Sequence, residues 1–280
     1  MNLKQTTATS TASDVASAAD QIRLLLRTDL LTRGRIVVIG LGGIGLHLVR
    51  ALTTFLAGLL TSLDETHSIE LLLVDGDSFT PENCYRMDVP DFGKKAEAVG
   101  RDLLGRMESP RLLVRWESVY VDDKNVSELI RDGDCVFLAC DNHATRRLVG
   151  RHCAGDSIVD VVLISGGNDG VENGSRGTYG NVQVFLRCKG INLTAPIERF
   201  HPEIANPADQ PPGELSCLEL AGSGVPQLGF ANLTAASAMC NSLMRLMMAE
   251  EGEAIYDELA FDVFEAVCTP HWLTAGCHAE

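Results

Sequence analysis

The sequence predicts an α/β fold with a doubly wound, mostly parallel sheet, extended at the C-terminal end by antiparallel strands and a long helix. Through the first half of the chain, short apolar, β-branched runs alternate with segments whose apolar residues recur at helical spacing. This alternation is typical of a parallel sheet covered by helices on both faces. The first apolar run also leads directly into a glycine turn, Gly40-Leu-Gly42-Gly43-Ile-Gly45, followed by a helical pattern.

The elements of the first half follow from these patterns in order. Residues 35–39 form a short β-branched run next to glycine, and residues 69–74 are apolar enough for a strand buried on both faces. The full set of predicted strands is 35–39, 69–74, 112–116, 135–139 and 158–164. The predicted helices between and before them are 19–31, 44–63, 94–107, 123–131 and 142–153.

The pattern changes from Ser165 onward. Glycine-rich turns precede a predicted strand at 180–188, and a proline-rich loop follows at 196–213. Residues 230–249 predict a long helix rich in Ala, Met and Leu, and residues 254–267 predict closing strands. No internal repeat or sharp linker divides the chain. We therefore expect a single domain over residues 21–280, after a disordered or frayed leader at 1–20 that is rich in Ser, Thr and Ala.

Composition and charge exclude several classes of protein. The formal net charge of −15 and scattered Lys and Arg residues argue against a nucleic-acid surface, which requires clustered cations. An acidic solvated surface or a basic protein partner both fit this charge. Nine cysteines without small-domain spacing indicate free thiols in a reducing compartment. With no signal segment and no apolar run of membrane-spanning length, we expect a cytoplasmic protein without a membrane partner.

The glycine turn predicts a phosphate-binding site in a Rossmann-like sheet. Gly40 permits the tight turn, Gly42 and Gly43 let backbone N–H groups approach a ligand, and Gly45 lets the helix pack closely on the strand. The N-terminus of the helix adds partial positive charge. This pattern is shared by proteins that bind NAD, FAD and ATP, and a tight turn without a ligand also remains open.

Polar residues that follow the second strand favour a triphosphate. Asp75 ends that strand, where an acid meets the ribose of a nucleotide, and Asp77 follows it. Asn83, Arg86 and Lys95 then cluster along the chain. Cations there would offset the charge that grows when the bond between the α- and β-phosphates breaks. Asp77 also has the simpler interpretation of binding only turn amides.

A second acidic position follows the fourth strand. Asp141 lies at its carboxyl end, opening onto the same crevice as the glycine turn, where a carboxylate can hold Mg²⁺ on phosphate oxygens. The alternative is that Asp141 caps the next helix, with Asn142 sharing the cap. Both roles are compatible.

At these residues the chain resembles the ThiF/MoeB/HesA family of adenylating enzymes, relatives of the ubiquitin-activating enzymes. Five motifs occur in family order over about the first half of the chain. They are the glycine turn, Asp75-Gly-Asp77, Asn83-Cys-Tyr-Arg86, Gly93-Lys-Lys95-Ala96 and Asp141-Asn142-His-Ala-Thr145-Arg146. The resemblance implies one ThiF-type adenylation domain, with a nucleotide-binding part at about 34–165 and a substrate-facing part at about 166–280.

The resemblance also implies site roles and partners. Gly43 and its neighbours would lie against ATP and Asp75 would hold the ribose, while Asp141 would bind Mg²⁺. Phosphate contacts would come from Asn83, Arg86 and Lys95. The substrate would be the C-terminal carboxylate of a ubiquitin-like protein with a Gly-Gly-type tail, converted to an acyl-adenylate with release of pyrophosphate. The family is commonly dimeric, so a homodimer is expected, with Arg23 or Arg27 offered to the opposite subunit.

The second half departs from the best-known family members. These carry two Cys-x-x-Cys pairs for a structural zinc ion, whereas this chain contains none, so no such zinc site is expected. The spacing of four residues near the C-terminus resembles that of zinc ligands: Cys268, His271, Cys277 and His278. The simpler interpretation is that these residues are scattered and form no site. The long first crossover and the short gap from Arg86 to Lys95, together with the segments 199–203 and 211–219, look like those of the ThiF-like proteins of plasmid-borne PRTRC gene cassettes. That likeness implies a ubiquitin-conjugating-enzyme-like partner and a deubiquitinase-like metalloprotease.

Three further questions stay open at this stage. Cys217 is a candidate thiol nucleophile in the proline-rich region, and a partly buried loop thiol is the alternative. Arg199 and His201 either line a groove for a peptide tail or are rim charges. Beside the adenylating enzyme, two other functions remain: a nicotinamide or flavin oxidoreductase using the same glycine turn, and a non-catalytic scaffold with the ThiF fold.

Overall fold

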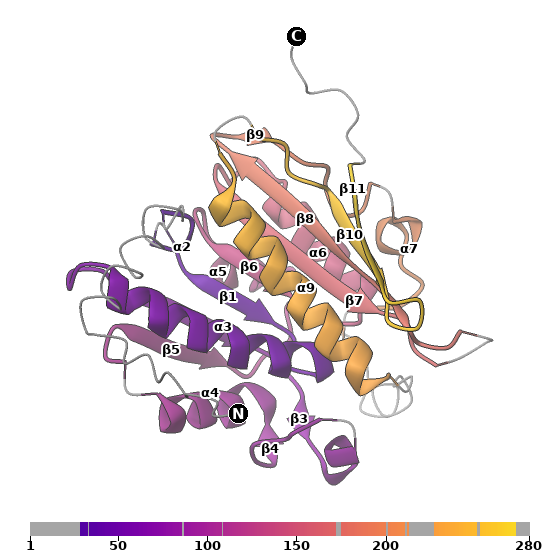
Figure 1. The fold of residues 1–280 in the computed structure, drawn as a ribbon, viewed down its shortest axis with the longest axis horizontal. Helices are drawn as coiled ribbons and strands as arrows, with labels where there is room; N and C mark the ends of the chain where they lie inside the picture. Colours follow the sequence, from indigo (N-terminus) through magenta and orange to yellow (C-terminus); the bar gives the residue numbers. More distant parts are fainter. Residues whose placement is uncertain are drawn as a thin grey trace, which may run out of the picture.

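A nine-stranded sheet forms the centre of the protein (Figure 1). The computed structural model describes residues 29–32, 34–85, 87–107, 109–171, 175–199, 201–210, 212, 227–250 and 253–272, and structural statements below refer to these. The strands of this sheet are β1 (Ile36–Ile39), β2 (Ile69–Val74), β5 (Leu112–Glu117), β6 (Cys135–Leu138), β7 (Val161–Asn168), β8 (Tyr179–Cys188), β9 (Ile191–Asn192), β10 (Glu258–Asp262) and β11 (Val267–His271).

Helices cover this sheet, and a small hairpin stands beside it. The helices are α2 (Asp29–Thr32), α3 (Gly43–Ser62), α4 (Lys95–Arg106), α5 (Val126–Leu129), α6 (His143–Cys153), α7 (Pro202–Ala205) and α9 (Gly229–Met248). The hairpin pairs β3 (Ser78–Phe79) with β4 (Gly93–Lys94), and the 3₁₀ helix η1 (Pro81–Tyr85) lies between its strands.

The strand order is β11-β10-β8-β7-β6-β1-β2-β5, with β9 paired to β8. Strands β5, β2, β1, β6 and β7 are parallel, and β8, β10 and β11 join by antiparallel pairing. The chain builds outward from β1 through β2 to β5 and then returns to β6 on the other side of β1. This reversal creates a switch point at the carboxyl ends of β1 and β6, the usual place for a ligand in an open α/β sheet.

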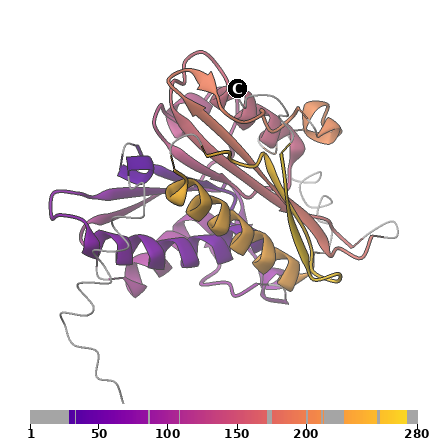
Figure 2. The ribbon, with the colours of Figure 1, turned by 45° about the horizontal axis from the view of Figure 1, so that its top comes forward.

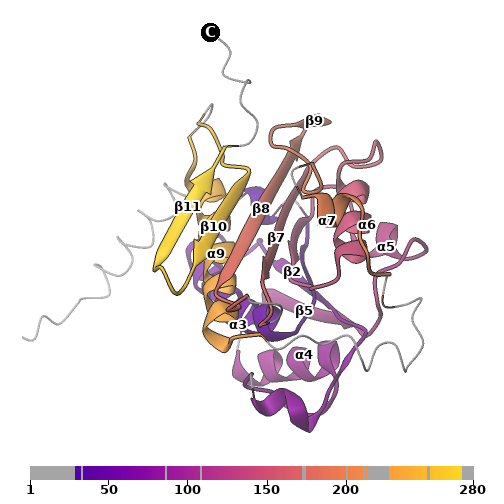
Figure 3. The ribbon, with the colours of Figure 1, turned by 90° about the vertical axis from the view of Figure 1, so that its right-hand side faces the viewer.

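Side chains alternate between two cores, one on each face of the sheet. In β1, Ile36 and Val38 point to the core under α3, α4 and α9, whereas Val37 and Ile39 point to the core under α5, α6 and α7. Figure 3 shows these helices on opposite sides of the sheet, and Figure 2 shows α9 lying along α3. The predicted α/β class with its antiparallel C-terminal extension is confirmed.

Helix α3 is more apolar than the sequence reading allowed. Its 20 residues reach a mean hydropathy of 1.5 over the most apolar window, which by length and composition alone would suffice to cross a membrane. In the fold, one side of α3 packs on the sheet and against α9, with Leu48, Leu52 and Leu56 fully or almost fully buried. Core packing therefore accounts for the hydropathy of this helix.

The largest departure from the predicted elements is β7. The sequence predicts a strand that ends at Ile164, yet β7 continues through Ser165 to Asn168 because all eight of its residues pair with β8. Gly166 and Gly167 make this continuation possible. A Cβ on Gly166 would lie 2.5 Å from Met239 Sδ of α9, and one on Gly167 would lie 2.3 Å from an Arg146 nitrogen. Glycines that suggested turns are thus close-packing positions inside a strand.

Smaller departures occur at the ends of elements. The predicted helix at 123–131 is only one turn, Val126–Leu129, because Asp122 and Asn125 form a hydrogen-bonded turn before it. Between the predicted strand at 69–74 and helix α4, where no element is predicted, the chain forms the β3–β4 hairpin and η1. The leader at 1–20 and most of the predicted helix at 19–31, including Arg23 and Arg27, lie outside the described residues.

Candidate functional site

The glycine turn connects β1 to α3 in a conformation that requires glycine at two positions. Gly40 has φ of +90°, and a Cβ there would lie 2.8 Å from the Ala139 carbonyl carbon and the Cys140 nitrogen at the end of β6. At Gly45 a Cβ would lie only 1.9 Å from the Gly40 carbonyl oxygen. The absence of side chains therefore lets β1, β6 and α3 converge at the switch point.

The N-terminus of α3 is open toward this switch point. The first N–H groups of a helix have no intrahelical acceptor. The N-cap residue Gly42 has no side chain to accept them, and the first turn of α3 contains no acidic residue. A Cβ on Gly42 would meet nothing within 4 Å. These backbone donors, together with the positive end of the helix dipole, are available to an anion.

Helix α6, which begins after the neighbouring strand β6, has a closed N-terminus. Asn142 Oδ1 accepts hydrogen bonds from Thr145 N at 2.7 Å and from Thr145 Oγ1 at 2.9 Å. The carboxylate of Asp209 accepts from His143 N at 2.8 Å and Ala144 N at 2.9 Å. Asn142 thus acts as the predicted helix cap, with Asp209 as a second cap, and α6 has few donors left for a ligand.

Asp75 joins the end of β2 to the glycine turn. Its carboxylate accepts hydrogen bonds from Leu41 N at 2.7 Å and from Asp77 N at 2.8 Å. Desolvation raises the pKa of Asp75, although the nearby Lys95 and these two backbone donors favour the ionised form. Asp75, the residue predicted to bind the ribose, therefore lies beside the glycine turn and holds that turn in place.

Lys95 and Asp77 form the charged centre of the site. Lys95 Nζ lies 3.0 Å from Asp77 Oδ2, and the Lys95 side chain is only 12% exposed. The Tyr120 hydroxyl donates to the other Asp77 oxygen at 2.6 Å. Desolvation alone would raise the pKa of Asp77, but Lys95 and the Tyr120 hydroxyl outweigh it and lower that pKa. Asp77 is therefore more than the binder of turn amides that the sequence also allowed.

The charge of Lys95 is stabilised by three carboxylates. Desolvation favours its neutral form, but Asp75, Asp77 and Asp141 outweigh this effect and raise the pKa of Lys95. Asp141 is exposed after the end of β6 and is close enough to Lys95 to favour its charged form. The structure thus gathers Lys95, Asp75, Asp77 and Asp141 around the end of the parallel strands, as the motif spacing predicts.

The β3–β4 hairpin brings Lys95 to this position. Its pairing of Ser78 with Lys94 folds the chain back, and Lys95 N donates to the Asp77 carbonyl at 3.0 Å. Asn83 lies in η1, where its Oδ1 accepts from Thr80 N at 2.9 Å and stabilises the connection. Arg86 lies outside the described residues, so its predicted phosphate contact stays a prediction.

Thiols of the described residues differ sharply in accessibility. Burial raises the pKa of Cys140, beside Asp141, to about 12, so this thiol stays protonated. Cys84 and Cys268 are exposed free thiols. Cys217, the candidate nucleophile, lies outside the described residues together with Cys277 and His278. Among the described side chains, no group of three or more His, Cys, Asp or Glu residues could hold a metal ion.

Four residues that the sequence reasoning missed, or gave no role, support the site. Arg146, 5% exposed, donates from Nε to the Cys140 carbonyl at 3.0 Å and from Nη2 to the Gly166 carbonyl at 2.7 Å. It therefore ties the Asp141 loop to β7. Tyr120 and Asp209 act through the contacts above, and Asn232 of α9 packs on Gly43. Arg146 belongs to a motif, but its link to β7 depends on Gly166, 20 residues away. Tyr120, Asp209 and Asn232 lie outside the motifs, and their partners are more than 40 residues away in sequence.

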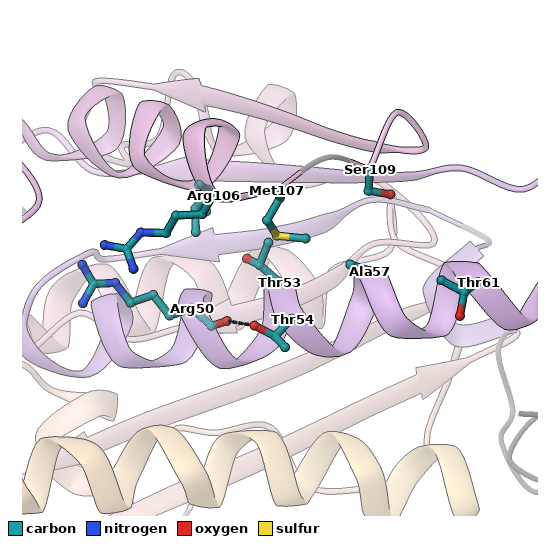
Figure 4. Close-up of a pocket in the computed structure, with 9 residues that line it drawn as sticks. Arg50, Thr53, Thr54, Ala57, Thr61, Arg106, Met107 and Ser109 are labelled. Carbon is teal, nitrogen blue, oxygen red and sulfur yellow. Dashed lines mark hydrogen bonds between the residues drawn. The ribbon is translucent and has the colours of Figure 1, made fainter. Parts of the chain in front are cut away.

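A separate cavity of about 470 Å³ lies between α3 and α4 (Figure 4). Arg50 and Arg106 line one part of it, and small residues of α3 such as Thr54 and Ala57 line another. Asp102 neutralises both arginines, and Asp88 also pairs with Arg50. The cavity follows the middle and C-terminal half of α3, so it lies away from the glycine turn and the charged cluster.

The fold and this geometry are those of a nucleotide-binding α/β protein, with an open helix N-terminus at the switch point of the sheet. The chain belongs to the ThiF family, because the model of that family matches residues 18–266. Membership of this family supports an adenylating activity in general terms. Comparison with curated proteins gives no match.

Solved structures with the same fold include MccB of E. coli. MccB with MccA-N7isoASN superposes with a TM-score of 0.61 and 17% sequence identity, covering 92% of this chain and 69% of MccB. MccB with ATP gives a TM-score of 0.59 and 17% identity, covering 88% and 66%. PaaA gives a TM-score of 0.59 and 12% identity, covering 98% and 78%. At such identities the similarity establishes the shared fold.

Proposed function

We propose that this protein is an ATP-dependent adenylyltransferase that activates the C-terminal carboxylate of a ubiquitin-like protein. The observation that carries the proposal is the open N-terminus of α3 next to the cluster of Lys95, Asp75, Asp77 and Asp141. Anion-binding donors and a cation on one side, with an exposed carboxylate on the other, suit a triphosphate bound with a divalent cation. A nicotinamide dinucleotide would give Lys95 and Asp141 no shared task.

Each residue has a distinct role in this proposal. The backbone N–H groups after Gly42 bind the phosphates, and Lys95 leaves Asp77 to contact them when ATP is bound. Asp75 holds the glycine turn and meets the ribose. Asp141 would bind Mg²⁺, which neutralises charge on the phosphate oxygens when present. Asn83 and Arg86 would add phosphate contacts.

The reaction requires little more than positioning and charge neutralisation. A carboxylate oxygen of the substrate attacks the α-phosphorus of ATP, the bond from that phosphorus to the bridging oxygen of the β-phosphate breaks, and pyrophosphate leaves. The product is an acyl-adenylate. An ionised carboxylate needs no general base, so the buried cation Lys95 and the N-terminus of α3 supply the main stabilisation of the transition state.

The family and its structural neighbours support the substrate class. MccB structures contain ATP or forms of MccA, and MccB is described as a microcin C7 biosynthetic enzyme. We propose that this protein likewise acts on a polypeptide, and specifically on the carboxylate of a Gly-Gly-type tail. The proposal also includes partners encoded in a PRTRC gene cassette and a homodimeric state. Residues 34–165 would then form the nucleotide-binding part and residues 166–280 the substrate-facing part.

Exchange of labelled pyrophosphate into ATP tests this function directly. Candidate proteins ending in Gly-Gly are screened for MgATP-dependent exchange, and active ones are repeated with Asp141→Ala. Asp141→Ala should abolish exchange while leaving the fold intact. Asp156→Ala is the matched control. Asp156 is an exposed acid beyond the C-terminal end of α6, whereas Asp141 precedes the N-terminal end of that helix.

Three results would contradict the proposal. Undiminished exchange in Asp141→Ala would remove the Mg²⁺ assignment. Thermal stabilisation by NADH but not by MgATP would favour an oxidoreductase, since saturating ligand at about 100 times Kd adds roughly 2.7 kcal/mol to stability. Absence of exchange with every candidate, despite binding of ATP, would favour a scaffold.

A further inference from the structure

Asn232 in the first turn of α9 is the side chain that joins the C-terminal half to the phosphate-binding turn. It is 1% exposed. A Cβ on Gly43 would lie 2.1 Å from Asn232 Nδ2 and 2.8 Å from its Cγ, so the carboxamide rests directly on the first residue of α3. Helices α3 and α9 pack along each other, which brings their N-terminal ends together at this site (Figure 1).

The carboxamide of Asn232 is incompletely satisfied. Its backbone N–H donates to the Leu228 carbonyl at 3.0 Å, but its Oδ1 is buried and has no hydrogen-bond partner within the structure described here. Buried polar atoms are almost always paired, because leaving one without a partner is energetically unfavourable. An unpaired acceptor beside an open anion-binding turn therefore indicates a ligand group that donates a hydrogen bond at this point.

The chemistry of Oδ1 decides which ligand group fits. Phosphate oxygens only accept hydrogen bonds, so they cannot satisfy this atom. The ribose is assigned to Asp75, at the end of β2 and on the opposite side of β1 from β6. A peptide group has one N–H donor and one C=O acceptor, and a carboxamide is complementary to both.

We propose that Asn232 binds the last peptide group of a polypeptide substrate, next to the carboxylate that is activated. Asn232 then makes the site specific for a polypeptide carboxylate over a small free carboxylic acid. Its position on α9 brings the substrate-facing part into contact with the turn that holds the phosphates. This inference rests on the proposed adenylation and adds the group by which the substrate is recognised.

Three adenosine ligands separate this role from a purely structural one. ATP tests the phosphate-binding turn alone. Acetyl-sulfamoyl adenosine imitates an acyl-adenylate without a peptide group, and glycylglycyl-sulfamoyl adenosine imitates one that contains it. Affinities are measured by calorimetry for the wild type and Asn232→Ala. Asn232→Leu is a second variant that keeps side-chain volume, and Leu233→Ala, half exposed on the same helix, is the control.

Asn232→Ala and Asn232→Leu should weaken binding of the glycylglycyl ligand by about tenfold, the loss expected for one buried hydrogen bond. Both should leave ATP and the acetyl ligand unchanged, and Leu233→Ala should leave all three unchanged. An equal loss for all three ligands would overturn the inference, because Asn232 would then act only on the turn. Unchanged binding of the glycylglycyl ligand would overturn it too. A wild type that binds none of the ligands would refute the proposed function itself.

Discussion

Two helices begin at the switch point of the sheet, and their N-termini are treated in opposite ways. Helix α3 follows β1 and begins at Gly43, and its N-cap residue Gly42 offers no side-chain cap. Helix α6 follows the adjacent strand β6, and the side chains of Asn142 and Asp209 accept hydrogen bonds from its first N–H groups. Both N-termini carry partial positive charge, yet a side-chain carboxylate accepts hydrogen bonds from the first N–H groups only at α6.

The difference between the two helices shows which of them keeps free N–H donors for an anion. A helix N-terminus attracts anions only if its donors remain free. At α6 the protein supplies its own carboxylate from Asp209, and at α3 the glycine turn supplies none. Lys95 also interacts electrostatically with Asp75, whose carboxylate accepts a hydrogen bond from Leu41 N in the turn before α3. In the proposed function, this asymmetry favours α3 over α6 as the site of the polyphosphate and leaves α6 as a structural element.

The largest effect is expected from closing the α3 end sterically. Gly45→Ala places a Cβ 1.9 Å from the Gly40 carbonyl oxygen, which is backbone and cannot move aside. We expect a loss of about 3 kcal/mol in the free energy of unfolding, the upper range for overpacking, and loss of MgATP binding. Urea unfolding and calorimetry measure the two effects.

Gly42→Ala is the matched variant. Its Cβ meets nothing within 4 Å, so the free energy of unfolding should change little. A bound phosphate at this turn would meet the new methyl group, and MgATP affinity should fall. If Gly42→Ala binds MgATP as tightly as the wild type, the α3 N-terminus is not where the phosphates lie.

The next largest effect concerns the charge beside α3. Lys95→Met removes the cation, whose Nζ lies 5.9 Å from the centre of the Phe79 ring, but keeps an unbranched side chain of similar length. Loss of one positioned charge at a transition state costs about 100-fold or more in rate, so pyrophosphate exchange should fall by about that factor. The control is Lys124→Met, an exposed lysine far along the chain. Equal exchange rates for both variants would show that Lys95 serves only to pair with Asp77.

The sequence predicted the parallel half of the molecule better than the rest. Strands β1 and β2 and helix α3 are signalled locally, by apolar periodicity and glycine, so their positions could be predicted within a few residues. The convergence of Asp75, Lys95 and Asp141 could be predicted because each follows a strand or turn at the same sheet edge. These predictions needed no knowledge of distant contacts.

At the closed end of α6, the Asn142 cap could be predicted but the Asp209 cap could not. Asp209 lies in a proline-rich loop more than 60 residues from the N–H groups that it caps, and nothing in its neighbourhood distinguishes it from other surface acids. The same holds for Tyr120, 43 residues from Asp77, and for Asn232 against Gly43. The continuation of β7 beyond Ile164 was missed because it depends on pairing with β8. Tertiary contact decides each of these features.

Opening the α6 end should have a smaller effect than closing α3. Asp209→Ala removes the acceptor for His143 N and Ala144 N. Loss of a helix cap costs about 1 kcal/mol, measured by urea unfolding. MgATP affinity should not change, because the phosphates bind at α3. The exposed N-terminus should also gain sulfate-dependent stabilisation that the wild type lacks. A parallel loss of MgATP affinity would place the nucleotide at α6 instead.

The smallest effect concerns how the Asp209 loop is held to the sheet. His201, 12% exposed, lies 3.0 Å from both Glu203 and Glu258, the latter in β10. Desolvation would lower the pKa of His201, but hydrogen bonds with these two carboxylates outweigh it and raise that pKa. Gln183 Nε2 lies 3.3 Å from His201 Nε2. His143 contributes to the lowered pKa of Glu203, and Glu203 contributes to the raised pKa of Asp169. The raised pKa favours the charged form of His201, which connects the loop that caps α6 to β10 through its two carboxylate partners.

A raised pKa in the folded state fixes the direction of the pH dependence. The contribution of His201 to stability should be fully present below the unfolded value of about 6.5, and should be lost as the pH rises through the higher folded pKa. Subtracting the unfolding free energy of His201→Gln from that of the wild type between about pH 5.5 and pH 8.5 isolates this term, because His201→Gln removes the titrating group. This difference in unfolding free energy should decline as the pH rises. Measured in an Asp209→Ala background, it should decline in the same way if His201 holds the loop through β10, because the cap at α6 is then not involved. A difference that is constant or rises with pH would show that His201 is neutral in the fold, and the closure of α6 would then rest on Asn142 and Asp209 alone.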